Sequence, residues 1–159
     1  MPDEALQDVL ARYHAGPRAG VFTDGSCEGN PGPGGWGFVW VHDDEILLER
    51  SGHDPATTNN RMELQALIEA YRALPRDADL TIHSDSRICV DTVNQWAAGW
   101  ERRGWKRKGG PIANLEQVKE LWSLSQARPT VTLQWIRAHD GSRWNEYADV
   151  LASSWLRGA

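Results

Sequence analysis

The chain has 159 residues, 40% of them hydrophobic and 25% charged, which is the composition of an ordinary folded domain and excludes a disordered or fibrous protein. No apolar stretch approaches the roughly 18 residues of a membrane span and no secretory signal is evident, so we expect a cytoplasmic protein. The chain has only two cysteines, and they lack CxxC spacing, so we expect neither disulfides nor zinc. The net charge of −5 argues mildly against a nucleic-acid partner, because phosphate contacts usually show as an excess of Lys and Arg.

Residues 1–18 are predicted to form an extension of the main domain, which spans residues 19–159. Within the extension, residues 3–14 carry apolar side chains at helical spacing, with acids at the start and Gly16-Pro17 at the end. We expect this short amphipathic helix to pack on the surface of the domain.

Three predicted strands come after the extension. Residues 21–23 lead into a polar, glycine-rich turn over residues 24–35, and residues 36–41 and 46–50 are extended on either side of an Asp-Asp turn. Strands that succeed one another with short connections predict an antiparallel meander.

Helices and strands alternate in the rest of the chain. The first helix has Leu64, Leu67 and Ile68 on its apolar face, Thr58, Asn59 or Asn60 as its N-cap, and Pro75 as its stop. The later elements are a strand over 80–84, helices over 86–96 and 112–126, a strand over 131–135 and a helix over 144–156. The order βββαβααβα predicts an α/β fold with a mixed sheet flanked by helices.

Four carboxylates stand where these elements begin or end. Asp24 and Asp85 end strands, Glu63 lies in the predicted first turn of a helix, and Asp149 lies one turn into the last helix. Clustered carboxylates raise one another's pKa values unless cations lie among them, and hydrolysis of a phosphodiester by two metal ions needs such a set of oxygen ligands. The acids therefore suggest a metal-dependent hydrolase.

Each acid taken alone also has a structural explanation. Asp24 can be a turn residue, Glu63 can favour the helix dipole, and Asp85 can cap the next helix. The loop after Asp24 begins with the spacing of a calcium loop, but Gly35 occupies the twelfth place, where a bidentate Glu is required. A calcium loop is therefore excluded.

The sequence around the acids decides between these explanations. Residues 23–35 (TDGSCEGNPGPGG) and 57–64 (TTNNRMEL) resemble the first two motifs of type 1 ribonucleases H. The resemblance covers roughly residues 19–156 and continues through Ser84-Asp85-Ser86, Gln95-Trp96, Trp100, Arg103-Gly104-Trp105-Lys106 and Asn145-Glu146 with Asp149. It implies the ribonuclease H-like fold, whose five-stranded sheet has three antiparallel strands and then two parallel ones. It also implies an endonuclease that cuts the RNA strand of RNA–DNA hybrids and leaves 5′-phosphate and 3′-hydroxyl ends.

The same resemblance gives the acids roles in holding two Mg²⁺ ions, for which Mn²⁺ is an alternative. Asp24 would bridge both ions, Asp149 would join it at the ion that activates water, and Glu63 and Asp85 would complete the other site.

His139 matches a family histidine in a mobile loop that assists proton transfer or product release. An imidazole with an ordinary pKa near 6.5 is suited to that task. The chain departs from the family here, because Ala138 stands where glycine is usual and the acidic Asp140 comes next.

Recognition of a hybrid requires contact with 2′-hydroxyl groups across the wide minor groove. By resemblance, the RNA sugars would meet Cys27, Gly29, Asn59 and Glu63, and the DNA strand would meet Asn30, Thr58 and Asn60, with Arg61 in the same motif. Glycines 29, 32, 34 and 35 are expected to permit a close approach of backbone to substrate. Arg87 replaces a common glutamine, which favours attraction to a phosphate over recognition of a sugar.

The segment from Trp96 to Lys108 answers the objection from net charge. Basic and aromatic side chains alternate there, opposed only by Glu101: Arg102, Arg103, Lys106, Arg107 and Lys108 with Trp96, Trp100 and Trp105. Such a mixture neutralises phosphates and packs rings against sugars or bases, as in the basic protrusion of the family. The alternative is a solvated surface over core tryptophans, and we expect Trp96 and Trp100 to be partly structural.

Two other functions fit the sequence less well. A hybrid-binding domain without nuclease activity would be expected to have lost at least one of the four acids. A junction resolvase or integrase core would lack the asparagine-rich second motif and the basic, tryptophan-rich segment. No obligate protein partner is evident, and a monomer is the default expectation.

Overall fold

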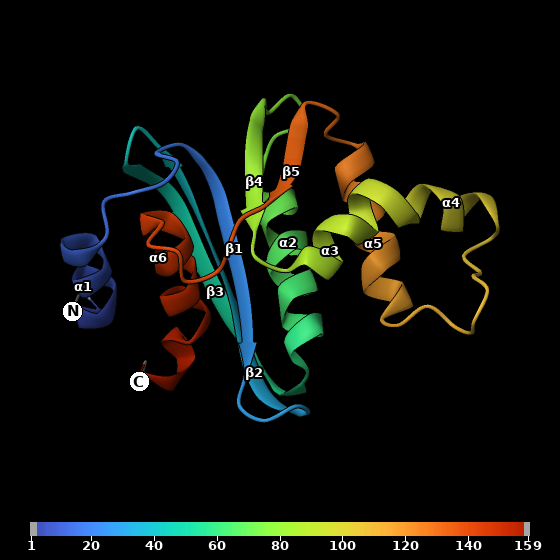
Figure 1. Ribbon diagram of the computed structural model, residues 1–159, viewed down its shortest axis with the longest axis horizontal. Coiled ribbons are helices and arrows are strands. Elements are labelled where there is room, and N and C mark those ends of the chain that lie inside the picture. Colours follow the sequence, from blue (N-terminus) through green and yellow to red (C-terminus); the bar gives the residue numbers. More distant parts are fainter. Residues whose placement is uncertain (1–2, 158–159) are drawn as a thin grey trace.

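The computed structural model describes residues 3–157 and has a single five-stranded sheet between two layers of helices (Figure 1). The strands are β1 (Gly20–Cys27), β2 (Gly32–His42), β3 (Glu45–Thr57), β4 (Leu80–Ser84) and β5 (Val131–Trp135). Their spatial order is β3-β2-β1-β4-β5, with antiparallel pairs among the first three and parallel pairs from β1 to β4 and from β4 to β5. The predicted α/β fold and mixed sheet are thereby confirmed. Positions 1, 2, 158 and 159 of the two predicted segments lie outside the described residues.

The helices divide between the two faces of the sheet. On one face lie α6 (Arg143–Ala152) and, outside it, α1 (Glu4–Arg12); on the other lie α2 (Asn59–Ala73) and, beyond it, α5 (Leu115–Gln126) (Figure 1). The short helices α3 (Arg87–Asp91) and α4 (Ala97–Arg102) lead away from the sheet edge. Among residues 3–157, no helix combines the length and the apolar character needed to cross a membrane.

The hairpin of β1 and β2 is longer than the sequence pattern predicted. Most of the predicted turn over residues 24–35 is strand, with only residues 28–31 between β1 and β2, and β3 likewise extends beyond residue 50 to Thr57. The reason is that Gly34 and Gly35 pair with Cys27 and Ser26 across the hairpin. Glycine-rich composition, which usually marks turns, here marks strand positions that have no room for a side chain.

The glycines of this hairpin serve the packing of the protein itself. A Cβ atom at Gly35 would lie 2.1 Å from the carbonyl oxygen of Ala152, and one at Gly37 would lie 2.7 Å from Cβ of Leu151. Similar approaches to the chain's own backbone occur at Gly32 and Gly34. Glycines 32, 34 and 35 therefore let α6 and the hairpin backbone pack closely, and the approach of a substrate to their backbone stays a prediction. Gly29, with φ of +79°, is the one that lies in the turn.

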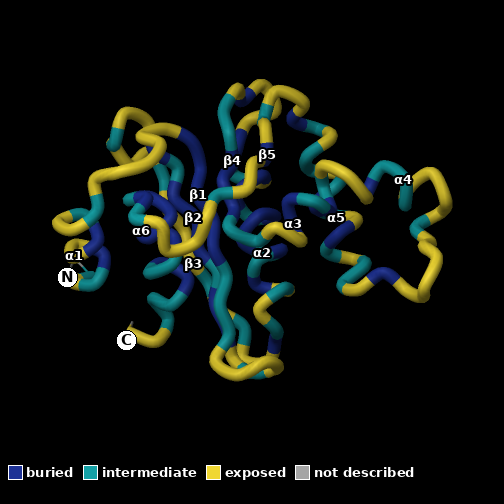
Figure 2. The backbone as a smooth tube through the Cα atoms, in the orientation of Figure 1, coloured by how far each residue is buried: buried dark blue, intermediate teal, exposed yellow. Residues whose placement is uncertain are grey.

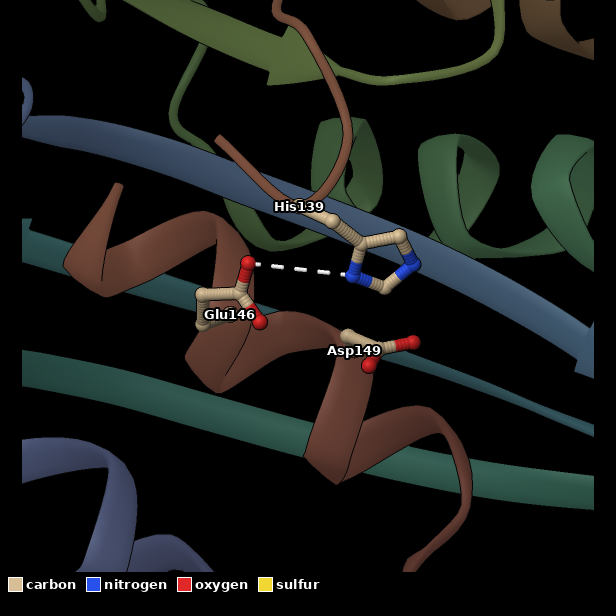
Figure 3. Close-up of side chains that lie close together, drawn as sticks. All are labelled: His139, Glu146 and Asp149. Atoms are coloured by element: carbon tan, nitrogen blue, oxygen red, sulfur yellow. Dashed lines mark ion pairs between the residues drawn. The ribbon is translucent and has the colours of Figure 1, made fainter. Parts of the chain in front are cut away.

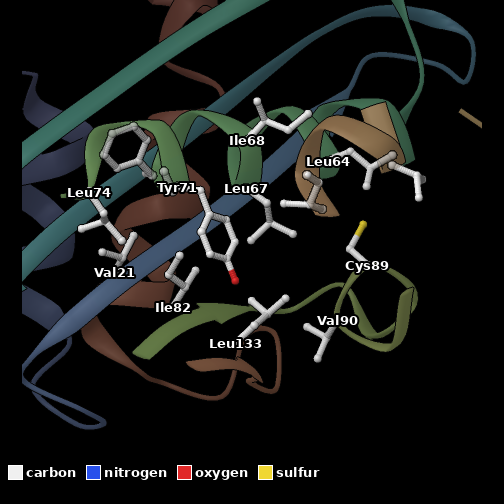
Figure 4. Packing of buried hydrophobic residues seen from close by; sticks show 14 of the residues in the cluster. Val21, Leu64, Leu67, Ile68, Tyr71, Leu74, Ile82, Cys89, Val90 and Leu133 are labelled. Atoms are coloured by element: carbon white, nitrogen blue, oxygen red, sulfur yellow. The ribbon is translucent and has the colours of Figure 1, made fainter. Parts of the chain in front are cut away.

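The core has two parts because successive residues of β1 point to opposite faces of the sheet. Val21 packs toward α2 in a cluster with Leu67, Ile82 and Leu133 (Figure 4). Phe22 packs toward α6 in a second cluster with Val39, Trp144 and Tyr147, to which α1 contributes Leu6 and Val9. The predicted N-terminal helix therefore exists, and two of its side chains belong to a hydrophobic core.

Three helix ends differ from the predicted bounds, whereas Thr58 caps α2 as one of the three predicted candidates and accepts a hydrogen bond from the N–H of Arg61 at 3.2 Å. The predicted helix over 112–126 begins only at Leu115, as α5. The predicted helix over 86–96 continues to Arg102 through a π-helical turn, η1 (Thr92–Trp96), in which the N–H of Ala97 donates to the Thr92 carbonyl. The last helix ends at Ala152 and is succeeded by a 3-10 turn, η2 (Ser154–Leu156).

His83, on β4, gives the protein a predicted weakness in acid. Its buried ring stacks on Phe22 with centroids 4.5 Å apart, and burial lowers the pKa of His83 from 6.5 to about 4. Between those pH values His83 binds a proton in the unfolded chain but stays neutral in the folded chain. The free energy of unfolding therefore falls as pH decreases from 6.5 to about 4. The full effect is about 3 kcal/mol. Urea unfolding at about pH 7 and about pH 4.5 should show that the free energy of unfolding falls less in His83→Phe than in the unmodified protein. An equal fall in the two proteins would show that His83 is not the cause.

Candidate active site

Three of the predicted acids meet at one edge of the sheet. Asp24 lies on β1 and is only 6% exposed, and Asp85 directly follows β4, the parallel neighbour of β1. Thr23 pairs with Ser84 in the parallel register of β1 and β4, so the next residues, Asp24 and Asp85, lie close together. The strand β1 continues past Asp24 to Cys27, so the prediction that Asp24 ends its strand is wrong. Glu63 reaches them from α2, and ligand atoms of Asp24, Glu63 and Asp85 all lie within 4.8 Å of one another.

Gly25 makes the approach of α2 possible. A Cβ atom at this position would lie 2.4 Å from both the backbone nitrogen of Glu63 and the backbone carbonyl carbon of Met62. The Gly25 N–H donates to Oδ1 of Asp24 at 2.9 Å and also to Oε1 of Glu63. The backbone at Gly25 therefore holds both carboxylates in place.

The three carboxylates are placed where ionisation is unfavourable. Burial raises the pKa of Asp24 well above its usual value, and the charges of Glu63 and Asp85 raise it further. Burial likewise raises the pKa of Glu63 well above its usual value and raises that of Asp85, against the lowering effect of hydrogen bonds within the cluster. No Lys, Arg or His among residues 3–157 forms an ion pair with these three acids. The arrangement therefore fits divalent cations, which prefer oxygen ligands and compensate the repulsion.

Asp149 joins this cluster from α6. After burial and the charges of the other acids, the side chain of Asp149 is a further cause of the raised pKa of Asp24. Asp149 also forms a second group with His139 and Glu146, again with ligand atoms within 4.8 Å of one another (Figure 3). All four predicted carboxylates are thus neighbours, although they come from four different elements.

His139 lies at the open side of the site. Its side chain is 73% exposed, and Nδ1 lies 3.7 Å from Oε1 of Glu146 (Figure 3). Its φ of +53° is a left-handed conformation, one residue after Ala138. Glu146 is buried and belongs to a recognised motif, yet the sequence pattern predicted no role for it. Its spacing of three residues before Asp149, on the same helix face, was the available signal.

Two of the acids lie deeper in their helices than predicted. Glu63 is the fifth residue of α2 and Asp149 the seventh of α6, rather than one in a first turn and the other one turn in. The helix α2 begins at Asn59, directly after Thr58, which was one of its predicted caps, and α6 begins at Arg143, one residue before its predicted start.

The residues predicted to meet the two substrate strands gather where the β1–β2 turn meets α2. Oδ1 of Asn30 accepts a hydrogen bond from the N–H of Asn59 at 3.2 Å, and Asn60 contacts Cys89. Arg61 is exposed beside them, and Gly29 lies in the turn. The thiol of Cys27 is turned inward to the carbonyls of Gly32 and Thr57, at 3.3 and 3.5 Å, which leaves its backbone as the group available to a substrate.

Arg87, close to the acid cluster, stacks on Trp135, a contact that the sequence pattern did not predict. Its guanidinium lies 4.1 Å from the ring centroid of Trp135, and the indole N–H of Trp135 donates to the Asp85 carbonyl at 3.3 Å. Trp135 is the last residue of β5, and its side chain is 39% exposed. A cation stacked in this way on a fixed indole loses little freedom when it meets a phosphate.

The basic, tryptophan-rich segment, which contains α4 and the start of the loop after it, projects from the molecule (Figures 1 and 2). Within residues 3–157 its cations form no ion pairs, and Arg103, Lys106, Arg107 and Lys108 line a hollow of about 570 Å³. Trp100 packs against the main core, as expected, whereas Trp96 is 40% exposed. Both rings line a largely apolar cavity of about 400 Å³ that Asn60 also borders.

Comparisons with known proteins agree with this geometry. Residues 17–157 match the family model RNase H. The chain is 42% identical over 144 residues to ribonuclease HI of Caulobacter vibrioides, covering 90% of this chain and 95% of that protein. It is 46% identical over 138 residues to ribonuclease H of Rhizobium meliloti, covering 83% and 86%.

Solved structures of the same family have a similar fold. LC9-RNase H1, a type 1 RNase H with the type 2 active-site motif, superimposes with a TM-score of 0.72 at 35% identity, covering 89% of this chain and 74% of its own. LC11-RNase H1, crystallised in complex with an RNA/DNA hybrid, has a TM-score of 0.61 at 25% identity, covering 86% and 97%. Family model, curated relatives and fold lead to one conclusion: the chain belongs to the RNase H family and is an endoribonuclease of the bacterial type.

Proposed function

We propose that this enzyme hydrolyses the RNA strand of RNA–DNA hybrids with two divalent metal ions, leaving 5′-phosphate and 3′-hydroxyl ends. The observation that carries the proposal is the buried cluster of Asp24, Glu63 and Asp85, with Asp149 beside it and, among residues 3–157, no cation paired with the cluster to neutralise it. The similar LC11-RNase H1, solved with an RNA/DNA hybrid, supports the choice of substrate. Action as a monomer in the cytoplasm, by a catalytic domain spanning residues 19–159, belongs to the same proposal.

The acids would share the metal ions between them. Asp24, Glu63 and Asp85 would hold one Mg²⁺, and Asp24 with Asp149 the other, with Mn²⁺ as an alternative. When bound, the ions supply an activated water and stabilise charge on the leaving 3′ oxygen. The Gly25 N–H orients Asp24 and Glu63, and the exposed ring of His139 is placed to exchange protons with solvent beside Asp149.

The substrate would lie across the edge that joins the acid cluster to the basic segment. The RNA sugars would meet the backbone of Cys27 and Gly29 together with Asn59 and Glu63, and Arg87 would meet an RNA phosphate. The DNA strand would continue past the α2 N-terminus to the protruding basic segment. The residues proposed to hold it are Asn30, Thr58, Asn60, Arg61, Trp96, Trp100, Arg102, Arg103, Trp105 and Lys106.

A comparison of three substrates tests the activity. Hybrid, duplex DNA and duplex RNA of one sequence would each be incubated with Mg²⁺, Mn²⁺ or EDTA. We expect cleavage of the RNA in the hybrid alone, with either metal and never in EDTA, because only the hybrid has 2′-hydroxyls on one strand and the acids need cations. Cleavage of duplex DNA, or activity in EDTA, would contradict the proposal.

The basic segment should set the salt dependence of hybrid binding. Removing Arg102, Arg103 and Lys106 together should weaken binding and reduce the slope of log K against log salt by at most about 0.9 for each lost phosphate contact. Fluorescence anisotropy over a range of salt, in Ca²⁺ to prevent cleavage, measures both quantities.

The matched control removes two arginines and one lysine from exposed positions elsewhere: Arg12, Arg76 and Lys119. It makes the same change in net charge and should leave the slope near that of the unmodified enzyme. Equal salt-dependence slopes for the two triple variants would count against the basic segment as the site that binds the hybrid.

A further inference from the structure

The loop that carries His139 is held at each end by another part of the chain. At its start, the N–H of Ile136 donates to the Ser84 carbonyl at 2.9 Å, at the end of β4. At its end, Ser142 forms an isolated parallel bridge with Ala15, whose carbonyl accepts from the next N–H along α6 at 3.0 Å. The residues between the anchors, 137–141, are exposed or half-buried. The segment before β1 therefore supplies one of the two anchors of this loop.

The side chain of Arg143 strengthens that anchor. Its Nε donates to the Tyr13 carbonyl at 2.7 Å and its Nη2 donates to the Leu10 carbonyl at 2.9 Å. These carbonyls lie at the C-terminal end of α1, where a positive charge is favourable. Arg143 is also the first residue of α6, so one side chain ties the end of α1 to the start of α6.

The helix α1 is itself firmly docked. Leu6 and Val9 are buried against Trp144 and Tyr147 of α6, and the carboxylate of Asp3 pairs with Arg157 at 2.8 Å. Packing at one face and an ion pair at the other end prevent α1 from sliding along α6. The helix can therefore act as a rigid support for residues 13–16, which contact the start of α6.

The crossing of the two segments is too close for any side chain at Gly16. Its φ is +87°, and a Cβ atom there would lie 2.5 Å from Oγ and 2.9 Å from Cβ of Ser142. Ser142 is the N-cap of α6 and lies three residues after His139. A change at Gly16 would consequently be transmitted to the end of the His139 loop.

We propose that the N-terminal segment positions the His139 loop, with Arg143 and Gly16 as the positioning residues. The inference rests on the proposed role of His139 and extends it to a part of the chain outside the recognised motifs. By fixing the start of α6, the segment fixes the approach of His139 to Glu146, now 3.7 Å, and to Asp149. Residues 3–16 thus support the proposed catalytic domain from outside its bounds.

Arg143→Ala tests the contact from the α6 side. Hydrogen exchange of the amides in residues 137–142 should accelerate by about tenfold or more, because the loop loses an anchor. The kcat for hybrid cleavage should fall about 3- to 10-fold with KM within about twofold, as expected for a displaced proton-transfer group. In an enzyme that already carries His139→Ala, Arg143→Ala should lower kcat no further.

Gly16→Ala tests the same contact from the N-terminal side and should give the same pattern. Arg143→Lys, which keeps the charge, should recover part of the loss, and Asp8→Asn on the exposed side of α1 should change nothing. Unchanged loop exchange in both Arg143→Ala and Gly16→Ala would overturn the inference, as would an equal fall of kcat with and without His139. Full kcat in His139→Ala alone would contradict the proposed role of His139, whereas the exchange measurement decides on the positioning contact by itself.

Discussion

Asp24→Asn is expected to abolish cleavage of the hybrid and, without metal, to stabilise the protein. Activity should fall by more than about 10³-fold, because this carboxylate lies at the centre of the acid cluster. Stability should rise because burial and the charges of Glu63 and Asp85 raise the pKa of Asp24. A carboxyl with a raised pKa favours the folded state at low pH, and that contribution is lost as pH rises through the folded-state pKa. At neutral pH the charged form of Asp24 destabilises the folded state, and asparagine removes that charge.

The gain in stability should be about 1–2 kcal/mol, which raises the melting temperature of a domain of this size by about 2–8 °C. Thermal unfolding in EDTA and in Mg²⁺ measures it, and Mg²⁺ should raise the melting temperature of the unmodified enzyme more than that of Asp24→Asn. Asp77→Asn, at an exposed acid away from the cluster, should leave stability and activity unchanged. If Asp24→Asn were less stable than the unmodified protein in EDTA, burial and the neighbouring carboxylates would not destabilise the charged form of Asp24.

Gly25→Ala should damage both the fold and the activity by adding a single methyl group. The new Cβ would meet the backbone of Met62 and Glu63 at 2.4 Å, and backbone within a helix cannot turn aside as a side chain can. The helix α2 must then move off β1, which costs about 1–3 kcal/mol. Because Gly25 also orients two carboxylates, a displacement of about 1 Å should lower kcat about 100-fold or more.

Gly99→Ala is the matched control for this variant. Gly99 lies within α4, where the nearest atoms to a new Cβ are guanidinium nitrogens of Arg103 at 3.3 Å, at the end of a flexible side chain. Alanine there should be neutral or stabilise by up to about 1 kcal/mol, since glycine is a poor helix former. Urea unfolding and steady-state kinetics on both variants decide the matter, and a fully active Gly25→Ala enzyme would refute the close-contact argument.

The acid cluster was predictable because two kinds of information coincided. The apolar runs placed Asp24 and Asp85 directly after Thr23 and Ser84, and these two residues pair in the parallel register of β1 and β4. The acids were therefore correctly expected to meet, although β1 does not end at Asp24 but continues to Cys27. The motif around Glu63 supplied the link to the helix. These features depend on local sequence and on general rules of sheet topology, both of which a single chain contains.

Other parts of the site depended on contacts that local sequence does not record. Trp135 follows the alternation of a buried strand residue but lies exposed beneath Arg87, since β5 is an edge strand beside the site. Gly35 looked like a turn residue because its close partner, Ala152 at the end of α6, lies over 100 residues away in the sequence. Arg143 bonds to a carbonyl 130 residues earlier, a separation at which no periodicity gives a signal.

The π-helical turn η1 lies between α3, which begins two residues after Asp85, and α4, which belongs to the proposed substrate-binding segment. A π turn holds one residue more than an α turn, so it accommodates an added residue while the helix continues in nearly its former direction. Loss of one residue between Thr92 and Trp96 should therefore restore a regular α-helix and leave α4 pointing close to its present direction. The length of this connection can thus vary by one residue without displacing either the four carboxylates or the basic segment.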